Sequence, residues 1–468
     1  MRLIATVFSA LAGLAAGCTL NQNYAQCQQD SDCPPNGAAK QFCTSDQICV
    51  PDTPEERLCA ITEPAQPAAQ AKHVGALLYM PPDAMTPAMT VRLHVLQHAV
   101  QEINELAKTD QAQPLALHIC DISGSAGDAQ NSFRVLVNKY AVSAVIGPDS
   151  QAALSDVVGL ASSSSVPILS PAATASAVVQ LPSRGYLLRM APVDTQQASP
   201  ISREVPNGSL LGLVSSEDSY GNNVRRSFLS SWMNRDSVNN KLRFSYSYNE
   251  STPGLLNMVA SQLVANQPTY AVLMVSDTQA QLVQQLKDLP NPPGDPTRAT
   301  QLVVSDSGHS DEMLALAARP DMAEHIARLR GIGPLTLSQS IEATEFKTAF
   351  QSHYPSDRLS SDVYAGYAYD ALYTVAVIMN SIKGDLTGDA VLQVLRRMTN
   401  SMTVLPMSRV TFADTVRIVN QGDTFTLSGA TGPIRFTPEG SRDPALFERW
   451  TIDTTTTPGK PTYVSTPL

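Results

Sequence analysis

The sequence predicts an α/β protein with two lobes, each built on a parallel central sheet. The lobes are joined by a three-crossover hinge and preceded by a small disulfide-rich segment. Short apolar runs alternate with helical patterns from Lys72 to about residue 174, and the same alternation repeats over residues 209–308. A pair of helical patterns and a late strand follow both blocks. Strands that alternate with helices favour parallel sheets covered on both faces.

The first block contains four strand candidates separated by three helical patterns. The helix expected over 91–107 carries apolar residues at helical spacing, for example Leu96, Val100 and Ile103. Parallel sheets bind ligands beyond the carboxyl ends of their strands, so the loops that follow these strands are candidate binding loops. The expected strands lie within 73–80, 114–123, 142–148 and 165–169, and the other helices within 128–141 and 151–164.

The second block has the same organisation and predicts the second lobe. Its expected strands lie within 209–216, 242–249, 269–277 and 300–308, with helices within 222–233, 254–266 and 279–289. Helices are then expected over 363–382 and 389–398, and a strand within 429–440. We expect the chain to cross between the lobes near residues 193, 333 and 427.

These patterns divide the chain into seven segments. The predicted segments are a signal peptide (1–17), a Cys-rich segment and tether (18–71), lobe 1 (72–193 and 333–427), lobe 2 (194–332 and 428–455) and a disordered polar tail (456–468).

Composition and the N-terminus indicate an exported, acidic protein. The chain has 468 residues, 43% of them hydrophobic, and a formal net charge of −10, which argues against nucleic acid as a partner. Its first 17 residues combine one arginine, a short apolar stretch and small residues, as signal peptides do. The stretch "LAAGC" resembles a bacterial lipobox, which implies that Cys18 is lipidated. We therefore expect a membrane-anchored lipoprotein that faces the periplasm or the cell surface.

The cysteines also suit an oxidising compartment. Of seven cysteines, a lipidated Cys18 leaves six. Four of them lie in a polar segment with few core-forming residues, where disulfides supply the missing stability. A zinc site is the competing hypothesis, but the cysteines are spaced more widely than zinc ligands usually are, and no histidine lies nearby. Three pairings are possible, of which Cys27–Cys43 with Cys33–Cys49 is the simplest, and Cys59–Cys120 is a plausible third bridge.

The stretch "SVPILSPAAT" (165–174) raises the question of a binding site. Its apolar residues suit a buried parallel strand, and Pro171 ends the ladder pairing. Ala172, Ala173 and Thr174 then leave the backbone accessible. These residues form either a turn into the next helix or a place where a small molecule docks.

The order of several motifs resembles the type I periplasmic binding proteins of the leucine/isoleucine/valine-binding group. The similar stretches are "AVIGPDSQAALSDVVGLASSSSVPILSPAAT", "SSEDSYGNNVRRSF", "YAYDAL" and "TGPIRFTPEG". The resemblance covers about residues 72–455 and leaves the Cys-rich segment outside. It implies two Rossmann-like lobes that close on a small solute, and a permease of the ATP-driven (ABC) class as partner.

The resemblance also implies site residues in both lobes. On lobe 1 the Thr174 hydroxyl and nearby N–H groups, assisted by Ser150 or Gln151, would take a carboxylate, and the Ala172 carbonyl would accept from an ammonium group. On lobe 2 Asp306 would hold the ammonium group and Tyr220 would cover the ligand. Asp277 would favour a polar ligand over an apolar one. The alternative for each of them, Asp277 included, is that these are ordinary loop and capping residues.

The remaining polar constellations do not support catalysis. His94, His98 and Glu102 share one helical face, which we interpret as a solvated polar face because the spacing of a zinc hydrolase is absent. "SDSGHSDE" lacks a nucleophile elbow, and "DISGSAGD" lacks the glycine of a calcium loop. We predict no catalytic residue, no metal site and no cofactor.

Three functions remain after these exclusions. The first is an extracytoplasmic binding protein for a small, amino-acid-like ligand that serves a transporter. The second is a surface or sensing receptor that is not coupled to transport. The third, an enzyme, is the least supported.

Overall fold

The computed structural model describes residues 27–29, 32–33, 41–43, 49–51, 58–124, 127–289, 299–456 and 460–468. The chain divides into two units, Met1–Asp52 and Thr53–Leu468, which are treated separately below. The predicted signal peptide and Cys18 lie outside the described residues. Export and lipidation therefore stay sequence predictions.

The first unit holds a short hairpin and two disulfides. Strands β1 (Gln41–Cys43) and β2 (Cys49–Pro51) pair antiparallel, with Cys43 opposite Cys49. The disulfides join Cys27 to Cys43 and Cys33 to Cys49, which is the simplest pairing that the sequence suggested. Because this segment offers few apolar side chains, the bridges supply the cross-links that a core would otherwise provide.

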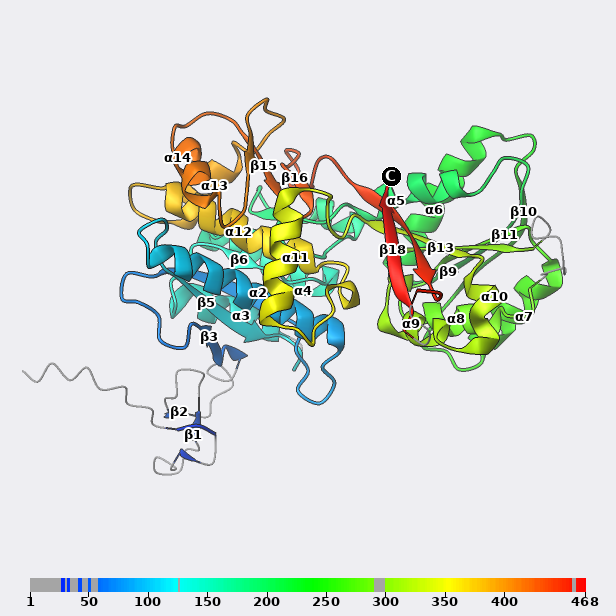
Figure 1. The fold of residues 1–468 in the computed structure, drawn as a ribbon, viewed down its shortest axis with the longest axis horizontal. Helices are drawn as coiled ribbons and strands as arrows, with labels where there is room; N and C mark the ends of the chain where they lie inside the picture. Colours follow the sequence, from blue (N-terminus) through cyan, green and yellow to red (C-terminus); the bar gives the residue numbers. More distant parts are fainter. Residues whose placement is uncertain are drawn as a thin grey trace, which may run out of the picture. The chain divides into compact units, whose positions relative to one another are not determined.

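Lobe 1 is built on a six-stranded sheet in the order β3-β5-β4-β6-β7-β8 (Figure 1). Its strands pair parallel except for β3, which is antiparallel to β5. The strands β4 and β5 are buried over most of their length because helices cover the sheet. The bounds are β3 (Ile61–Glu63), β4 (Lys72–Leu78), β5 (Leu115–Asp121), β6 (Val145–Ile146), β7 (Ile168–Ser170) and β8 (Leu187–Arg189).

The helices of lobe 1 come from two separate stretches of the chain. The helix α12 is buried on nearly all sides, since it packs against α2, α13 and α14. A small sheet of β14 (Val404–Pro406), β15 (Thr426–Gly429) and β16 (Gly432–Ile434) belongs to the same stretch. The helices are α2 (Pro87–Ala107), α3 (Asp128–Asn138), α4 (Gln151–Ser164), α11 (Ile341–His353), α12 (Ala365–Ser381), α13 (Gly388–Leu395) and α14 (Phe412–Val419).

Lobe 2 is built on a seven-stranded sheet in the order β10-β9-β11-β12-β13-β17-β18. The first five strands pair parallel, whereas β17 and β18 are antiparallel. Its strands are β9 (Leu210–Ser216), β10 (Lys241–Tyr248), β11 (Tyr270–Met274), β12 (Gln301–Val304), β13 (Leu329–Pro334), β17 (Phe447–Asp453) and β18 (Thr462–Pro467). Its helices are α5 (Asp194–Glu204), α6 (Ser219–Arg235), α7 (Leu255–Asn266), α8 (Gln279–Gln285), α9 (Asp311–Ala317) and α10 (Ala323–Ile326). The predicted two-lobe α/β fold is confirmed.

Strand membership places the crossovers between the lobes. The chain leaves the lobe 1 sheet after β8 and enters α5 of lobe 2, and it leaves lobe 2 after β13. It returns between Ile434 and Phe447, later than the expected position near residue 427. The difference arises because β15 and β16 pair with β14 of lobe 1 rather than with the lobe 2 sheet.

Of the strands that the sequence did not predict, two lie in segments that were assigned to the tether and to the tail. Residues 61–63, assigned to the tether, form β3 on the edge of lobe 1, and the Cys59–Cys120 disulfide links this region to β5. The expected disordered tail was wrong for residues 462–467, which form β18 along β17. Both strands are short edge strands with polar residues, so they lack the apolar run that marks a buried strand.

The interpretation of His98 and Glu102 as a solvated face was wrong. Both side chains are buried, because α11 and α12 cover that side of α2. The Glu102 carboxylate accepts hydrogen bonds from the hydroxyls of Tyr369 at 2.8 Å and Tyr373 at 2.9 Å. Burial raises the pKa of Glu102 and lowers that of His98 to about 4. Helices far away in sequence supply this cover, so the pattern of α2 alone could not reveal it.

Candidate functional site

The turn after β6 positions the first predicted residues of lobe 1. Gly147 has φ +81°, and a Cβ there would lie 2.4 Å from the Leu77 carbonyl oxygen, so the turn requires glycine. Ser150 then caps α4, since its side chain accepts from the Ala153 N–H at 3.2 Å. Gln151 is the first residue of the helix. The structure thus gives Ser150 a capping role and leaves it exposed toward solvent.

The loop after β7 uses most of its polar groups internally. The Ser170 hydroxyl donates to the Pro148 carbonyl at 2.6 Å and accepts from the Ala173 N–H at 3.2 Å. The Thr174 N–H donates to the Ala172 carbonyl at 2.9 Å. Within the described part of the chain, the Thr174 hydroxyl has no hydrogen-bond partner and is half-buried. The loop therefore offers one free hydroxyl but fewer free N–H groups than expected.

The second half of the candidate site centres on Asp306, which follows β12. The Tyr220 hydroxyl, from the start of α6 in the same lobe, donates to one carboxylate oxygen. The Tyr364 hydroxyl, immediately before α12 of lobe 1, donates to the other at 2.8 Å. Burial, and then the charge of Asp306, raise the pKa of both tyrosines. The carboxylate is thus held from both lobes.

Asp194, at the start of α5, brings the two halves together. Its N–H donates to the Thr174 carbonyl at 2.9 Å, and one carboxylate oxygen accepts from the Thr195 N–H at 2.6 Å. The other oxygen is buried without a well-aligned hydrogen bond in the described residues, although the N–H and hydroxyl of Ser176 lie near enough to lower the pKa of the carboxyl. Burial raises the pKa of Asp194 to about 6, and the charge of Asp306 acts in the same direction. Thr174, Asp194 and Asp306 therefore surround one region where the lobes meet.

Asp277 belongs to a different acidic group. The Glu250 carboxylate accepts from the N–H groups of Ser276, Asp277 and Thr278 at 2.7, 2.9 and 2.6 Å. The side chain of Asp277 is exposed, and its pKa is raised by burial of its carboxyl and by the charges of Glu250 and Asp218. No hydrogen bond among the described residues links Asp277 to Asp306. The edge of lobe 2 at β9, β10 and β11 is therefore acidic.

A half-buried arginine in lobe 1 is neutralised by its neighbours. Arg92 of α2 makes two hydrogen bonds to Asp362, at 2.8 and 2.6 Å, and one to Asp149. Its guanidinium lies 5.7 Å from the centre of the Tyr364 ring. Both aspartates already bind the Arg92 guanidinium. Arg92 therefore positions Tyr364 and the loop after β6 rather than offering a positive charge to a ligand.

Sequence reasoning missed Asp194, Tyr364 and Arg92. In the sequence each is an ordinary residue of a helix or next to a helix. Their contacts form only because segments that are distant in the sequence come together in the fold. Tyr364 lies three residues before "YAYDAL", so its proximity to that motif was the one available signal.

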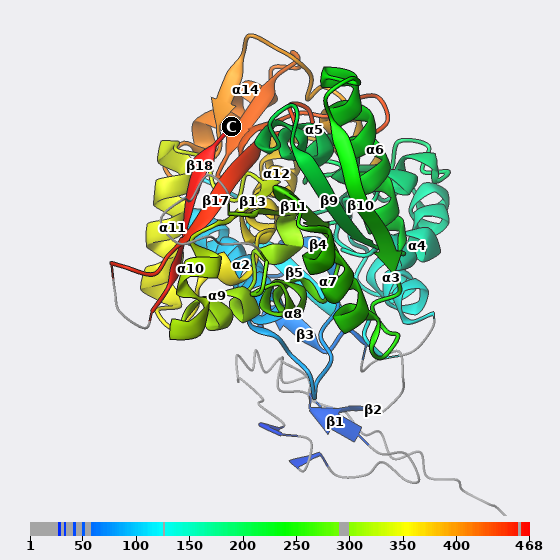
Figure 2. The same ribbon diagram turned by 90° about the vertical axis from the view of Figure 1, so that its right-hand side faces the viewer.

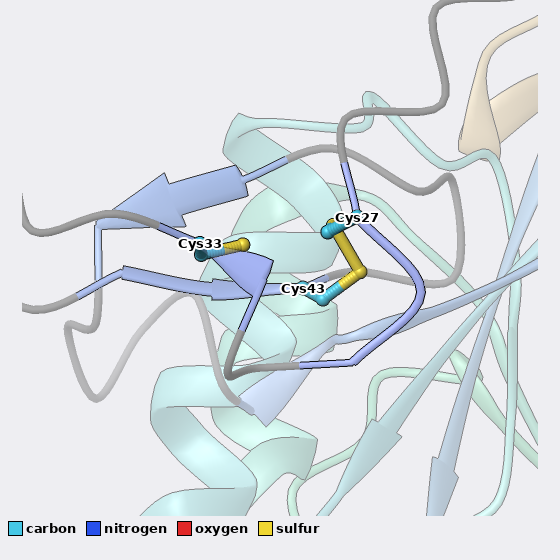
Figure 3. A group of neighbouring side chains, drawn as sticks. All are labelled: Cys27, Cys33 and Cys43. Atoms are coloured by element: carbon cyan, nitrogen blue, oxygen red, sulfur yellow. A yellow bond between two sulfur atoms is a disulfide. The ribbon is translucent and has the colours of Figure 1, made fainter.

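The Cys-rich unit contains a group of sulfurs that resembles a metal site in spacing (Figure 3). The Sγ atoms of Cys27, Cys33 and Cys43 lie within 4.8 Å of one another. Metal binding requires thiolates, whereas Cys27 is bonded to Cys43 and Cys33 to Cys49. In this oxidised form the group offers no thiolate.

Comparison with known proteins identifies a binding-protein fold. The family model for the receptor family ligand binding region matches residues 91–455. No curated protein matches the sequence. Of the helices in the described residues, none combines the length and apolarity needed to cross a bilayer.

Several solved structures share the fold at low sequence identity. The branched-chain amino acid transporter substrate-binding protein LivJ from Streptococcus pneumoniae, in complex with isoleucine, has a TM-score of 0.62 at 17% identity, covering 85% of this chain and 100% of its own. The leucine-binding protein LivK from Thermotoga maritima has 0.58 at 15%, covering 84% and 98%. A solute-binding protein of an ABC transporter from Rhodopseudomonas palustris, in complex with 3,4-dihydroxybenzoic acid, has 0.61 at 12%, covering 85% and 96%. These similarities establish the type I periplasmic binding fold.

Proposed function

The chain belongs to the receptor family ligand binding region family, and from this premise we propose that it binds a small, polar, amino-acid-like solute between its two lobes. The observation that carries the proposal is the position of Asp306. Its carboxylate follows a strand of lobe 2 and accepts a hydrogen bond from Tyr364 of lobe 1. A charged group at the junction of two lobes can contact a ligand between the lobes and favour their closed arrangement.

The ligand would use groups from both lobes. The Thr174 hydroxyl would donate to the ligand carboxylate, with Ser150 or Gln151 assisting. The Ala172 carbonyl already accepts from Thr174, but a carbonyl oxygen has a second lone pair for an ammonium group. Asp306 would accept from the ammonium group after exchanging one tyrosine donor, and Tyr220 would cover the ligand.

The charges around this region favour an amine-bearing ligand. Asp194 and Asp306 are both buried, and one Asp194 oxygen lacks a well-aligned hydrogen bond in the described residues. The cation nearest to Tyr364, Arg92, is occupied by two aspartates. Arg189 is also buried and interacts electrostatically with Asp194, so an ammonium group would add a second cation beside the two carboxylates. Asp277 would make the outer part of the site polar.

Calorimetry with the soluble protein tests this proposal. Titration with amino acids, short peptides, amides and sugars should show binding of a zwitterion. A charge-assisted hydrogen bond contributes about 1.5–3 kcal/mol, so Asp306→Asn and Thr174→Val should each weaken binding by roughly ten- to a hundredfold. Asp385→Asn, on an exposed loop, is the matched control. Binding of uncharged solutes alone, or unchanged affinity in Asp306→Asn, would contradict the proposal.

We further propose that the protein is an extracytoplasmic lipoprotein anchored at Cys18, and that it presents its ligand to an ABC-type transporter. The relatives reported above are substrate-binding proteins of such transporters, which supports the second part. Cys18→Ser should release the protein from membranes, as judged by fractionation and by the mass of the N-terminal peptide. Deleting the gene should reduce uptake of the ligand identified by calorimetry.

The alternative is a ligand-sensing receptor that is not coupled to transport. The disulfide-linked first unit favours it, because a separate cross-linked segment is suited to contacting another protein. Unchanged uptake in the deletion strain, together with retained ligand binding by the purified protein, would favour the receptor.

A further inference from the structure

A second cavity lies away from the predicted ligand residues. It has a volume of about 720 Å³ and is bounded by α11, by the segment that leads into α12 and by the C-terminal hairpin of β17 and β18. The red hairpin lies on the side of lobe 2 that faces the yellow α11 in Figure 1, the two overlap in the view of Figure 2, and both contribute lining residues. None of the seven predicted ligand-binding residues is among its described lining residues. The cavity is therefore distinct from the region around Asp306.

The acidic groups that line this cavity are already satisfied. Asp357 is 2.6 Å from the His94 Nδ1, and Asp362 is bonded twice by Arg92. Glu448 accepts from the Thr336 hydroxyl at 3.0 and 3.3 Å, and burial raises its pKa to about 7. These carboxyl groups are therefore hydrogen-bonded within the protein, and Glu448 is partly protonated near pH 7.

The basic side chains that line the cavity have no partner within the described residues. Lys347 of α11, Arg358 of the loop after α11 and Lys460 before β18 are exposed and have no ion pair or hydrogen bond in the part of the chain that the structure describes. Arg358 and Lys460 also line an adjoining hollow of about 220 Å³. Three free cations on separate segments thus converge on one concave surface, which favours an anion.

The floor of the cavity is largely apolar and contains one buried histidine. Leu314, Leu337 and Phe346 line it. His309 stacks on Tyr463 with ring centres 3.6 Å apart, and its Nδ1 is buried with no well-aligned hydrogen bond in the described residues. Burial lowers the pKa of His309 to about 4, so the ring is neutral, and the backbone carbonyls of His309 and Ser360 lie near enough to accept from it. The ligand should therefore combine an apolar body with one anionic group.

A segment beyond the family match supplies one wall. The match ends at residue 455, whereas Lys460, Tyr463 and Ser465 line the cavity. The other walls come from both lobes, since Leu314 belongs to α9 of lobe 2 and Phe346 to α11 of lobe 1. We propose that this cavity is a second ligand site, which takes a small organic anion with an aromatic or other apolar body. A ligand there contacts both lobes and the hairpin at once.

Fluorescence titration with 8-anilinonaphthalene-1-sulfonate tests the proposal, with N-phenyl-1-naphthylamine as the neutral analogue that lacks the sulfonate. The folded protein should bind one sulfonate probe per chain and bind it more tightly than the neutral analogue. Each exposed cation contributes weakly, so Lys347→Gln, Arg358→Gln and Lys460→Gln should each weaken binding about two- to fivefold, and the triple variant by tenfold or more. Binding should also weaken as salt is added.

A triple control separates the site from net charge. Arg226→Gln, Lys287→Gln and Lys383→Gln remove three exposed cations elsewhere and should leave the affinity unchanged, with both triple variants melting as the parent does. Asp306→Asn and Thr174→Val should also bind the probe normally, so failure of the proposed amino-acid site would not affect this result. Equal loss in both triple variants, equal affinity for the neutral analogue, or loss in Asp306→Asn would overturn the proposal.

Discussion

At the scale of single residues, Asp194 is the most informative group. Its side chain is buried, and one of its oxygens lacks a well-aligned hydrogen bond among the described residues. An ionised carboxylate in that position is destabilising, because the charge has left water without full compensation. The raised pKa of about 6 expresses the same imbalance. A cationic ligand placed between the lobes would reduce it.

The raised pKa predicts how stability depends on pH. An unfolded aspartate titrates near pH 3.9 and folded Asp194 near 6, so the native state binds the extra proton between these values and loses stability as pH rises through them. Above about pH 7 the loss amounts to about 3 kcal/mol. Asp194→Asn should therefore stabilise the ligand-free protein by up to that amount at pH 8 and have little effect at pH 3.5. Urea unfolding at several pH values, with Asp385→Asn as control, measures this; a pH-independent difference would contradict it.

For single residues, the sequence could predict where a side chain lies in the fold better than it could predict which groups that side chain contacts. Tyr220 and Asp306 were both expected at the site, and the structure joins them by a hydrogen bond. Their role in binding a ligand stays a prediction. Ser150 proved to be a helix cap, and Asp277 lies in a separate acidic group. Local sequence identifies residues at strand ends, whereas the contacts of Asp306 depend on a tyrosine that is distant in sequence.

At the scale of elements, the contact between β13 and β17 depends on a missing side chain. Gly331 of β13 lies opposite Trp450 of β17, and a Cβ at Gly331 would fall 1.9 Å from the indole ring. Trp450 is buried and also contacts the rings of His309 and Tyr463 edge-on. The glycine therefore allows the antiparallel strand β17 to join an otherwise parallel sheet.

Gly331→Ala should destabilise the protein by about 1–3 kcal/mol, because the added Cβ would overlap the buried indole ring, which is packed against His309 and Tyr463. Gly159→Ala is the matched control. It lies on α4 with no atom within 4 Å of the added Cβ, so the change should stabilise the helix by about 0.5–1 kcal/mol. Chemical denaturation measures both. Equal effects of the two substitutions would show that the indole contact is unimportant.

Most buried strands of the two blocks were predictable, although the buried strands β8 and β13 were missed, and the edge strands β3 and β18 were not predicted. Strands β6 and β7 are fully buried, and the apolar run of residues 166–169 includes most of β7. The strand β18 is mostly exposed and polar, so its sequence resembles a tail. It is ordered because its whole length pairs with β17. This pairing depends on the free edge of β17, so the sequence of β18 itself shows no alternation of apolar and polar residues that would predict a strand.

At the scale of the whole molecule, one disulfide closes a long loop in lobe 1. Cys59 and Cys120 are 61 residues apart in sequence, so the bridge restricts a large part of the unfolded chain. The loop-entropy relation gives a stabilisation of about 4 kcal/mol for such a separation. The double variant Cys59→Ala and Cys120→Ala should lose about this much free energy of unfolding, measured in urea without reductant. A loss below about 1 kcal/mol would contradict the expectation.

The hydrogen bond between Tyr364 and Asp306 should influence the balance between open and closed lobes. Tyr364 belongs to lobe 1 and Asp306 to lobe 2, whereas Tyr220 bonds the same carboxylate from within lobe 2. A hydrogen bond to a carboxylate contributes about 1.5–3 kcal/mol, so Tyr364→Phe should shift a two-state equilibrium roughly ten- to a hundredfold toward open forms.

Tyr220→Phe is the matched control, because it removes a hydroxyl from the same carboxylate without removing a link between lobes. Small-angle X-ray scattering of the ligand-free variants should show a larger radius of gyration for Tyr364→Phe than for Tyr220→Phe. Saturating ligand should bring Tyr364→Phe back toward the parent value, since binding between the lobes favours the closed form. If both variants scatter alike without ligand, the hydrogen bond does not act as a link between the lobes, and closure must depend on the other contacts across the cleft, such as that of Ser361 with Asp311 at 3.1 Å.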